Sequence, residues 1–331
     1  MGRVEGSTVG VTPFGDIERH RRELTAYCYR MLGSPFEAED AVQDTMLRAW
    51  RGRDRFEGRA SLRSWLYSIA TNVCLDALAG RPRRARPMDL GPARSPHGPI
   101  GEILPEVTWI EPVPDALVIA EDADPALVAE TRETVRLAFV AALQHLPPRQ
   151  RAVLILCEVL HWKSAEVAQL LGTSVASVNS ALQRARATLD ATDVPGLGAR
   201  SAPLAEADRS LLARYVEAFE HYDMDALVTL IREDATQSMP PYELWLHGRS
   251  DILDWWVGPG AGCRNSRVLE TSTANGLPAF GQYKPSESGS GHDPWALQVL
   301  RLRDGGIAEF TFFLATATLF PLFGLPARLE A

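Results

Sequence analysis

The chain has 331 residues, of which 46% are hydrophobic and 23% charged, so it is long enough for two or three globular domains. This composition excludes a fibrous protein, a small disulfide-rich scaffold and a wholly disordered chain. The formal net charge of −8, taken as one number, argues against a nucleic-acid partner.

The charge is divided unevenly along the chain. Residues 16–86 contain 14 arginines and 10 acidic residues, a balance of +4, and residues 131–190 contain 7 basic and 4 acidic residues, a balance of +3. Residues 99–130 contain 8 acidic residues and no lysine or arginine, while residues 200–331 contain 11 basic and 17 acidic residues. The acidity therefore belongs to a connector and to the last third, and the two basic segments are candidates for contact with phosphate.

The cysteines form no CxxC motif or Cys/His cluster that could hold a metal ion, so we expect no metal site and no other cofactor. We interpret them as reduced, buried thiols. The most apolar stretch, residues 307–326, is interrupted by prolines and Glu309, and no basic-then-apolar leader opens the chain. We therefore expect a cytoplasmic protein with no membrane partner. The cysteines are Cys28, Cys74, Cys157 and Cys263.

Three amphipathic helical patterns follow one another in residues 16–86. Ser34-Pro35 supplies a cap and a first-turn proline for the second helix, whose buried stripe is predicted to reach Trp50. The third pattern, residues 62–78, repeats the same spacing most regularly. The segment therefore predicts a three-helix domain.

Composition divides the rest of the chain. A long segment rich in Pro, Gly and acidic residues is typical of a linker, helical spacing then resumes, and the last third changes to two helices followed by strand-like runs. Arg303–Gly306 lies between two of these runs and predicts a hairpin. The predicted organisation is a mobile N-terminus at 1–15, a helical domain at 16–86, a linker at 87–130, a second helical domain at 131–190, a linker at 191–204 and an α+β domain at 205–331.

The sharpest local motif lies between Ser164 and Arg186. A short apolar helix is followed by Gly172, which can adopt a positive φ, and by Ser174, which can cap a second helix whose inner face includes Val175. This pattern is typical of a helix-turn-helix, although a plain helical hairpin has the same spacing. The outer face of the second helix offers side chains that can read base edges and contact phosphate. These DNA-binding candidates are Ser174, Ser177, Asn179, Ser180, Gln183, Arg184 and Arg186.

Two ordered motifs resemble the sigma-70 family of bacterial RNA polymerase initiation factors. The first comprises Glu37–Asp44 and Ser61–Asn72, and the second comprises Leu146–Arg151 with the helix-turn-helix. The chain is similar, more narrowly, to the extracytoplasmic-function group, which keeps only regions 2 and 4. The last third resembles the SnoaL-like fold that is appended to some of these factors, and Trp109–Pro112 in the linker also looks like that subgroup.

The resemblance implies that region 2 binds core RNA polymerase, with its β′ and β subunits as partners. In the family, the outer face of the second helix docks on the β′ coiled coil. Here that face carries acidic and amide groups that can pair with arginines of a partner, although a merely solvated face has the same composition. The candidates are Glu39, Asp40, Gln43 and Asp44.

The resemblance also implies binding of promoter DNA. The arginine-rich loop before the third helix, with the start of that helix, is expected to bind the melted minus-10 element, which requires cations along the backbone and donors around an unstacked base. Trp65 falls in the apolar stripe and is expected to pack in the core. The minus-10 candidates are Arg53, Arg55, Arg59, Ser61, Arg63 and Asn72.

Region 4 is expected to bind the minus-35 element through the helix-turn-helix. Asn179 and Ala181 occupy positions at which lysine or arginine is common in the family. Fewer ionic contacts are therefore available, and we expect a weaker and less salt-sensitive interaction than for a more basic relative.

The SnoaL-like resemblance implies helices packed on a curved sheet around a pocket. Tyr215, His221, Asp223 and His247 could supply polar groups there, and Glu309 is the one mild candidate for a catalytic carboxylate. The aromatic residues are explained more simply as core, and Arg303–Gly306 resembles a motif that contacts the sigma core in related factors. The candidate pocket residues are Trp245, Trp256, Phe280, Phe310 and Phe312.

The expected fold is therefore two all-α sigma domains followed by an α+β SnoaL-like cone. We expect an alternative sigma factor, not an enzyme, in which the acidic third domain docks on region 2, region 4 or both and modulates activity. An unidentified small molecule is a candidate ligand of that domain. The alternative is a small-molecule-binding or enzymatic module tethered to DNA.

Overall fold

The computed structural model describes residues 13–56, 58, 60–119, 124–192 and 205–330. Arg59, most of the predicted N-terminus at 1–15 and most of the predicted linker at 191–204 lie outside these ranges. The helices are α1 Arg21–Leu32, α2 Pro35–Gly52, α3 Leu62–Leu78, α4 Asp115–Val118, α5 Pro125–Val135, α6 Leu137–Gln144, α7 Pro148–Leu154, α8 Ser164–Leu170, α9 Val175–Ala191, α10 Glu206–Glu220, α11 Met224–Leu230, α12 Arg249–Val257 and α13 Thr316–Leu322. The strands are β1 Ile231–Ser238, β2 Trp245–His247, β3 Arg267–Glu270, β4 Ala279–Pro285, β5 His292–Arg303 and β6 Gly306–Phe313.

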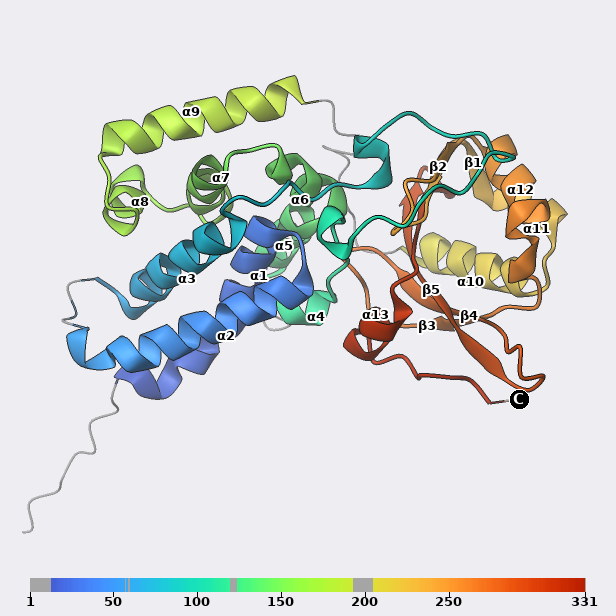
Figure 1. Cartoon of the computed structure of the whole chain (residues 1–331), viewed down its shortest axis with the longest axis horizontal. Coiled ribbons are helices and arrows are strands. Elements are labelled where there is room, and N and C mark those ends of the chain that lie inside the picture. Colours follow the sequence, from blue (N-terminus) through green and yellow to red (C-terminus); the bar gives the residue numbers. More distant parts are fainter. Residues whose placement is uncertain (1–12, 57, 59, 120–123, 193–204, 331) are drawn as a thin grey trace, which may run out of the picture.

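Helices α1 to α3 form the predicted first bundle (Figure 1). Ser34 caps α2, because its hydroxyl accepts a hydrogen bond from the backbone N–H of Glu37 at 3.4 Å. The prediction that Trp50 lies in the buried stripe is wrong, since its side chain is 56% exposed. Ala49 takes the buried position instead, about 100° away around the helix.

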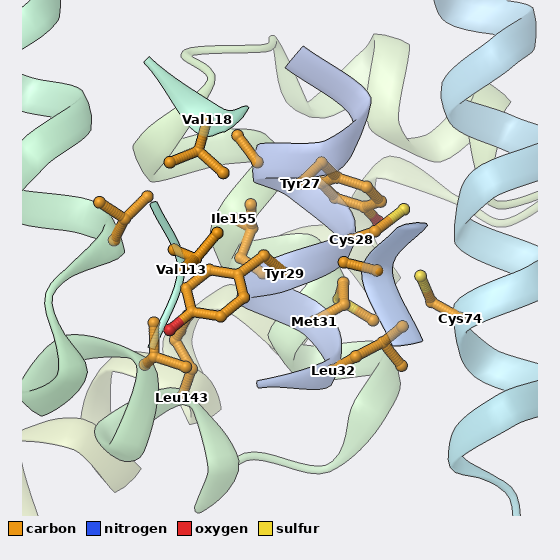
Figure 2. Close-up of a cluster of buried hydrophobic side chains, with 14 of the residues drawn as sticks. Tyr27, Cys28, Tyr29, Met31, Leu32, Cys74, Val113, Val118, Leu143 and Ile155 are labelled. Carbon is orange, nitrogen blue, oxygen red and sulfur yellow. The ribbon is translucent and has the colours of Figure 1, made fainter. Parts of the chain in front are cut away.

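The core of the helical part surrounds α1 (Figure 2). Cys28 and Cys74 are buried there, as predicted, whereas Cys157 and Cys263 are only half-buried, which corrects the prediction for that pair. Cys157 lies on the π-helical turn after α7, and Cys263 lies at the end of the short 3-10 helix that follows α12.

Residues 87–119, predicted to be part of a linker, are packed against both neighbours. Trp109, Ile110 and Val113 are buried, and Val113 lies beside Tyr29 of α1 (Figure 2). Helix α5 begins at Pro125, where Asp124 accepts a hydrogen bond from the backbone N–H of Ala126. Residues 87–119, which we call the strap, thus connect the two helical domains as an ordered segment.

The third part is a six-stranded sheet in the order β2-β1-β6-β5-β4-β3, with β1 and β6 parallel and the other pairs antiparallel. The predicted hairpin is present: Arg303 pairs with Gly306, and Asp304 and Gly305 both have positive φ. Helices α10, α11 and α12 pack on one face (Figure 1).

Alternate residues of the strands point to opposite faces of this sheet. Leu300 and Phe310 face the core under α10 and α12. Leu297 and Val299 instead belong to the continuous core that also includes α1, α6 and α13. The sheet is therefore buried on both sides, and the helical part supplies one of its covers. Among the described residues, no helix is long and apolar enough to cross a membrane.

Candidate functional site

Helices α8 and α9 form the predicted helix-turn-helix. Gly172 has a φ of +60°, and Ser174 caps α9 by accepting a hydrogen bond from the N–H of Ser177 at 3.1 Å. Val178 and Ala185 are buried against α7 and α8. Val175, predicted on the inner face, is 44% exposed, so the prediction is wrong for this residue of the first turn of α9.

The outer face of α9 runs along the outside of the helical part (Figure 1). All seven predicted DNA-binding residues of this motif are exposed. Arg186 forms an ion pair with Glu158 of the π-helical turn. Among the described residues, the Arg184 guanidinium has no hydrogen bond or ion pair. Arg184 is therefore available to a phosphate, whereas the charge of Arg186 is partly neutralised by Glu158.

The predicted polymerase-binding face of α2 divides into paired and unpaired groups. Glu39 accepts from Arg21 at 3.1 Å and from Gln43 at 3.2 Å. Asp44 is paired with Arg48 at 2.8 Å. Asp40 is exposed and has no ion pair among the described residues. Of the three carboxylates on this face, only that of Asp40 is therefore available to pair with a cation of a partner protein.

Two exposed apolar residues extend the same face of α2. Leu47 is 46% exposed and Trp50 56%, and both follow Asp40 and Gln43 at helical spacing. The Arg53 guanidinium lies 4.4 Å from the centroid of the Trp50 ring. An outward apolar stripe beside polar groups is typical of a protein-binding surface. This stripe was not predicted from the sequence, although the helical spacing of Leu47 from Asp40 could have indicated it.

The predicted minus-10 residues are not gathered into one site. Arg53, Ser61 and Asn72 are exposed, and Ser61 caps α3 through the N–H of Ser64. Nothing is described for the side chain of Arg55 or for Arg59. Arg63 is held by Glu23 at 2.7 Å. Trp65 is half-buried and packs beside Phe56 at the other end of the loop.

Arg63 also joins the two helical domains. Its guanidinium lies 5.2 Å from the ring of Tyr67 on α3 and 5.4 Å from the ring of Trp162, which precedes α8. The two rings are themselves 5.1 Å apart, and Ser68 donates to the Leu170 carbonyl at 3.3 Å. Helix α3 therefore carries minus-10 candidates and at the same time contacts the helix-turn-helix.

Arg151, in the Leu146–Arg151 motif, is buried rather than available to DNA. It donates to the Met31 carbonyl at the end of α1 and to Gln144 at 2.7 Å. Burial lowers the pKa of Arg151 to about 10. This arginine holds α7 on the first bundle.

Comparison with known proteins decides the family. Residues 17–84 match Sigma-70 region 2, residues 136–189 match Sigma-70 region 4, and residues 212–310 match the SnoaL-like domain. The chain is 49% identical over 322 residues to the ECF RNA polymerase sigma factor SigG of Mycobacterium tuberculosis, covering 95% of this chain and 85% of the relative. The chain belongs to the ECF sigma factors.

Two further comparisons agree. ECF sigma factor SigJ of M. tuberculosis is 30% identical over 222 residues, covering 67% of this chain and 62% of SigJ. The crystal structure of SigJ has the same fold, with a TM-score of 0.57 at 21% identity over 95% of this chain and 99% of that one. The predicted multidomain fold is confirmed, and this sigma factor is a promoter-recognition factor of transcription initiation rather than an enzyme.

The third domain of this sigma factor is joined to the helical part through Asn275, between β3 and β4. Asn275 is fully buried, and its Oδ1 accepts from the Val113 N–H at 3.0 Å. Its Nδ2 donates to the Tyr29 hydroxyl at 2.7 Å and to the Val135 carbonyl at 2.6 Å. One side chain thus binds the strap, α1 and the end of α5. In the sequence, Asn275-Gly276 is a dipeptide typical of a turn, and no local pattern indicates this contact.

Buried carboxyl groups of the strap reinforce this contact. Asp115 accepts from Thr273 and from the Gly276 N–H, each at 2.8 Å. Glu111, in the Trp109–Pro112 motif, is 5% exposed, and its nearest cation is Arg84 at 3.7 Å. Burial raises the pKa of Glu111 to about 7, against the opposing effects of a hydrogen bond from Ser34 and the charge of Arg84.

The predicted pocket of the third domain is only partly correct. Trp256 and Phe312 line a cavity of about 340 Å³, whereas Phe280 and Phe310 are buried in the core beneath it. Trp245 does not line it, because its indole N–H donates to the Gly91 carbonyl and holds the strap.

The polar residues predicted for the pocket also lie outside it. Tyr215 donates to Gln298 within the core, and Glu309 is paired with Arg301 at 2.8 Å on the side facing the helical part. His221, Asp223 and His247 do not line the cavity. Gln237, Tyr222, Cys263 and Lys284 line it instead. No local sequence pattern indicates this set, because its members come from separate elements.

Proposed function

We propose that this sigma factor binds core RNA polymerase through the outer face of α2. Asp40, Gln43, Leu47 and Trp50 form an exposed surface with polar and apolar groups, on which the Arg53 guanidinium lies against the Trp50 ring. We call these four residues the α2 patch. In protein interfaces, tryptophan is enriched among the few residues that contribute most of the binding energy, and polar groups commonly surround these residues. The β′ coiled coil and the β subunit are the proposed partners.

We propose further that α9 reads the minus-35 element and that the Arg53–Asn72 segment contacts the minus-10 element. The observation that carries the proposal is the outer face of α9, where Ser180, Gln183 and Arg184 are exposed and have no side-chain partners among the described residues. Amide and hydroxyl groups can read base edges in a major groove, and a guanidinium can bind phosphate or guanine.

The two interfaces can be separated experimentally. The double variant Gln183→Ala/Arg184→Ala should lose promoter-dependent transcription while keeping its affinity for core polymerase. Trp50→Ala should lose affinity for the core enzyme while keeping binding of the full chain to a minus-35 duplex. Arg328→Ala, at an exposed arginine of the third domain, is the control. If the α9 variant transcribes normally, or the Trp50 variant binds core polymerase normally, that assignment is wrong.

The third domain is proposed to stabilise the compact arrangement of regions 2 and 4. Asn275 joins α1, the strap and α5, while Arg63 and Trp162 hold α3 near the helix-turn-helix. The minus-10 and minus-35 elements are separate stretches of DNA, so a chain bound to both must part α3 from α8. A chain ending near Pro203 should therefore give more run-off transcript per molecule bound to core polymerase. Unaltered transcription would contradict the regulatory role.

A further inference from the structure

An apolar cavity of about 340 Å³ lies in the third domain between the sheet, α10 and α12. Cavities of this volume hold small molecules, and aromatic walls favour flat apolar ones. The apolar lining of this cavity includes the side chains of Phe219, Met239, Trp255, Trp256, Trp295 and Phe312.

Gln237 provides a hydrogen-bond donor inside this cavity. The Trp256 indole can only donate, so its bond of 2.6 Å fixes Oε1 of Gln237 on that side. The amide nitrogen then contacts only the Met239 sulfur, at 3.9 Å, and sulfur is a weak acceptor. The side chain is 2% exposed. A buried amide N–H₂ without a strong acceptor is costly, and an oxygen atom of a bound molecule would satisfy it.

Lys284 provides a cation at another part of the wall. Its Nζ lies 3.1 Å from the centroid of the Trp295 ring, and no carboxylate lies within 4.0 Å of it among the described residues. Burial lowers the pKa of Lys284, with the Cys263 thiol as a smaller opposing influence. An anion brought next to this ammonium would offset the cost of its burial.

We propose that this cavity binds a flat apolar molecule with a carboxylate at one end, which pairs with Lys284, and a neutral oxygen acceptor at the other, which accepts from Gln237. Both polar groups are donors, and none of the described residues lining the cavity is acidic. Gln237 is on β1 and Lys284 on β4, which are three strand spacings apart in the sheet. Lys284 also lies further along the strands, because Gln237 is in register with Phe310 and through it with Leu300, whereas Lys284 is in register with Asp293. The two groups therefore lie at different parts of the cavity wall and hold opposite ends of the ligand.

The strap between regions 2 and 4 completes the wall of this site. Gly98 and Ile100 line the cavity. The strap is held on either side of them by the Arg94 N–H, which donates to the Trp245 carbonyl at 2.9 Å, and by the Leu104 N–H, which donates to the Pro241 carbonyl at 3.0 Å. A molecule in the cavity therefore contacts the segment that connects the two DNA-binding domains, and its binding stabilises the docked strap.

The test uses the full chain with 6-methoxy-2-naphthoate, which has a carboxylate and a distant oxygen acceptor, and with 6-methoxy-2-naphthamide, its neutral counterpart. Calorimetry should show binding of the naphthoate at one site, at least tenfold tighter than that of the naphthamide. Lys284→Met should weaken the naphthoate at least tenfold and leave the naphthamide unchanged. Lys163→Met makes the same change at an exposed position of the helix-turn-helix and should alter neither.

Hydrogen exchange measures directly whether the ligand stabilises the strap. Naphthoate should slow exchange of the backbone amides of residues 94–104 in the full chain, and in the Lys284→Met variant the same concentration should slow it less. Absence of saturable binding, equal affinity for the two compounds, or exchange unchanged at saturation would each overturn the proposal. Circular dichroism and a thermal melt verify that the variants are folded. The readout needs neither DNA nor polymerase, so it succeeds or fails independently of the transcription proposals.

Discussion

Replacing Asn275 with alanine removes three hydrogen bonds that join the third domain to the helical part of the chain. The Tyr29 hydroxyl keeps the Glu111 carbonyl as its acceptor at 2.8 Å, so it remains satisfied. The Val113 N–H and the Val135 carbonyl lose their side-chain partner in a buried place. At about 1–3 kcal/mol for each unsatisfied group, the substitution should cost about 2–6 kcal/mol.

Asn265→Ala is the matched control for this variant. Asn265 has a φ of +58°, close to the +53° of Asn275, but it is exposed and its side chain has no hydrogen bond among the described residues. Both variants therefore carry the same cost of an alanine in a left-handed backbone conformation. The difference between them isolates the docking contact.

The assay is denaturant unfolding of the full chain, followed by near-UV circular dichroism and by hydrogen exchange at Val113. Asn275→Ala should unfold at lower denaturant than Asn265→Ala and should exchange the Val113 amide faster under native conditions. If the two variants have equal free energies of unfolding and equal exchange at Val113, Asn275 does not hold the domains together.

Three further predictions concern single side chains. Glu111→Gln should raise the free energy of unfolding by about 3 kcal/mol above pH 8 and by little at pH 4.5. The reason is that the folded-state pKa of Glu111, about 7, exceeds the unfolded value of 4.5, so the wild-type chain loses stability as the pH rises between these values. Denaturant titrations at several pH values measure this gain, and a gain independent of pH would contradict the prediction. Arg184→Ala should reduce the salt slope of minus-35 duplex binding by about 1, and Arg186→Ala by less because Glu158 already pairs with it, as anisotropy titrations would show; equal slopes would refute this difference. Trp50→Ala should weaken core-polymerase binding at least about tenfold, measured by fluorescence competition, whereas Leu269→Ala at an exposed site of the third domain should not.

The elements of this chain could be predicted because their signals are local. Ser34 and Ser61 cap helices, Gly172 turns the helix-turn-helix, and Asp304-Gly305 closes a hairpin, and each depends on a few neighbouring residues. The family motifs of regions 2 and 4 were likewise contiguous. Sequence therefore sufficed for the order of domains and for the exposed face of α9.

What sequence could not predict depends on packing between distant segments. Arg63 is of the residue type and at the position expected for a DNA contact, yet Glu23 and Trp162 hold it at the junction of two domains. Trp50 follows the apolar stripe by periodicity but lies outside it near the end of α2. The roles of Asn275 and Lys284 depend on which strands and straps lie against them, and no local pattern encodes that arrangement.

As an ECF sigma factor, the chain directs core RNA polymerase to promoters. Run-off transcription of a library of genomic fragments, with purified core polymerase and the full chain, measures this activity. We expect discrete start sites that are absent with core polymerase alone and that disappear with Gln183→Ala/Arg184→Ala. Transcripts that do not depend on the added chain, or start sites unchanged by the α9 substitutions, would contradict this expectation.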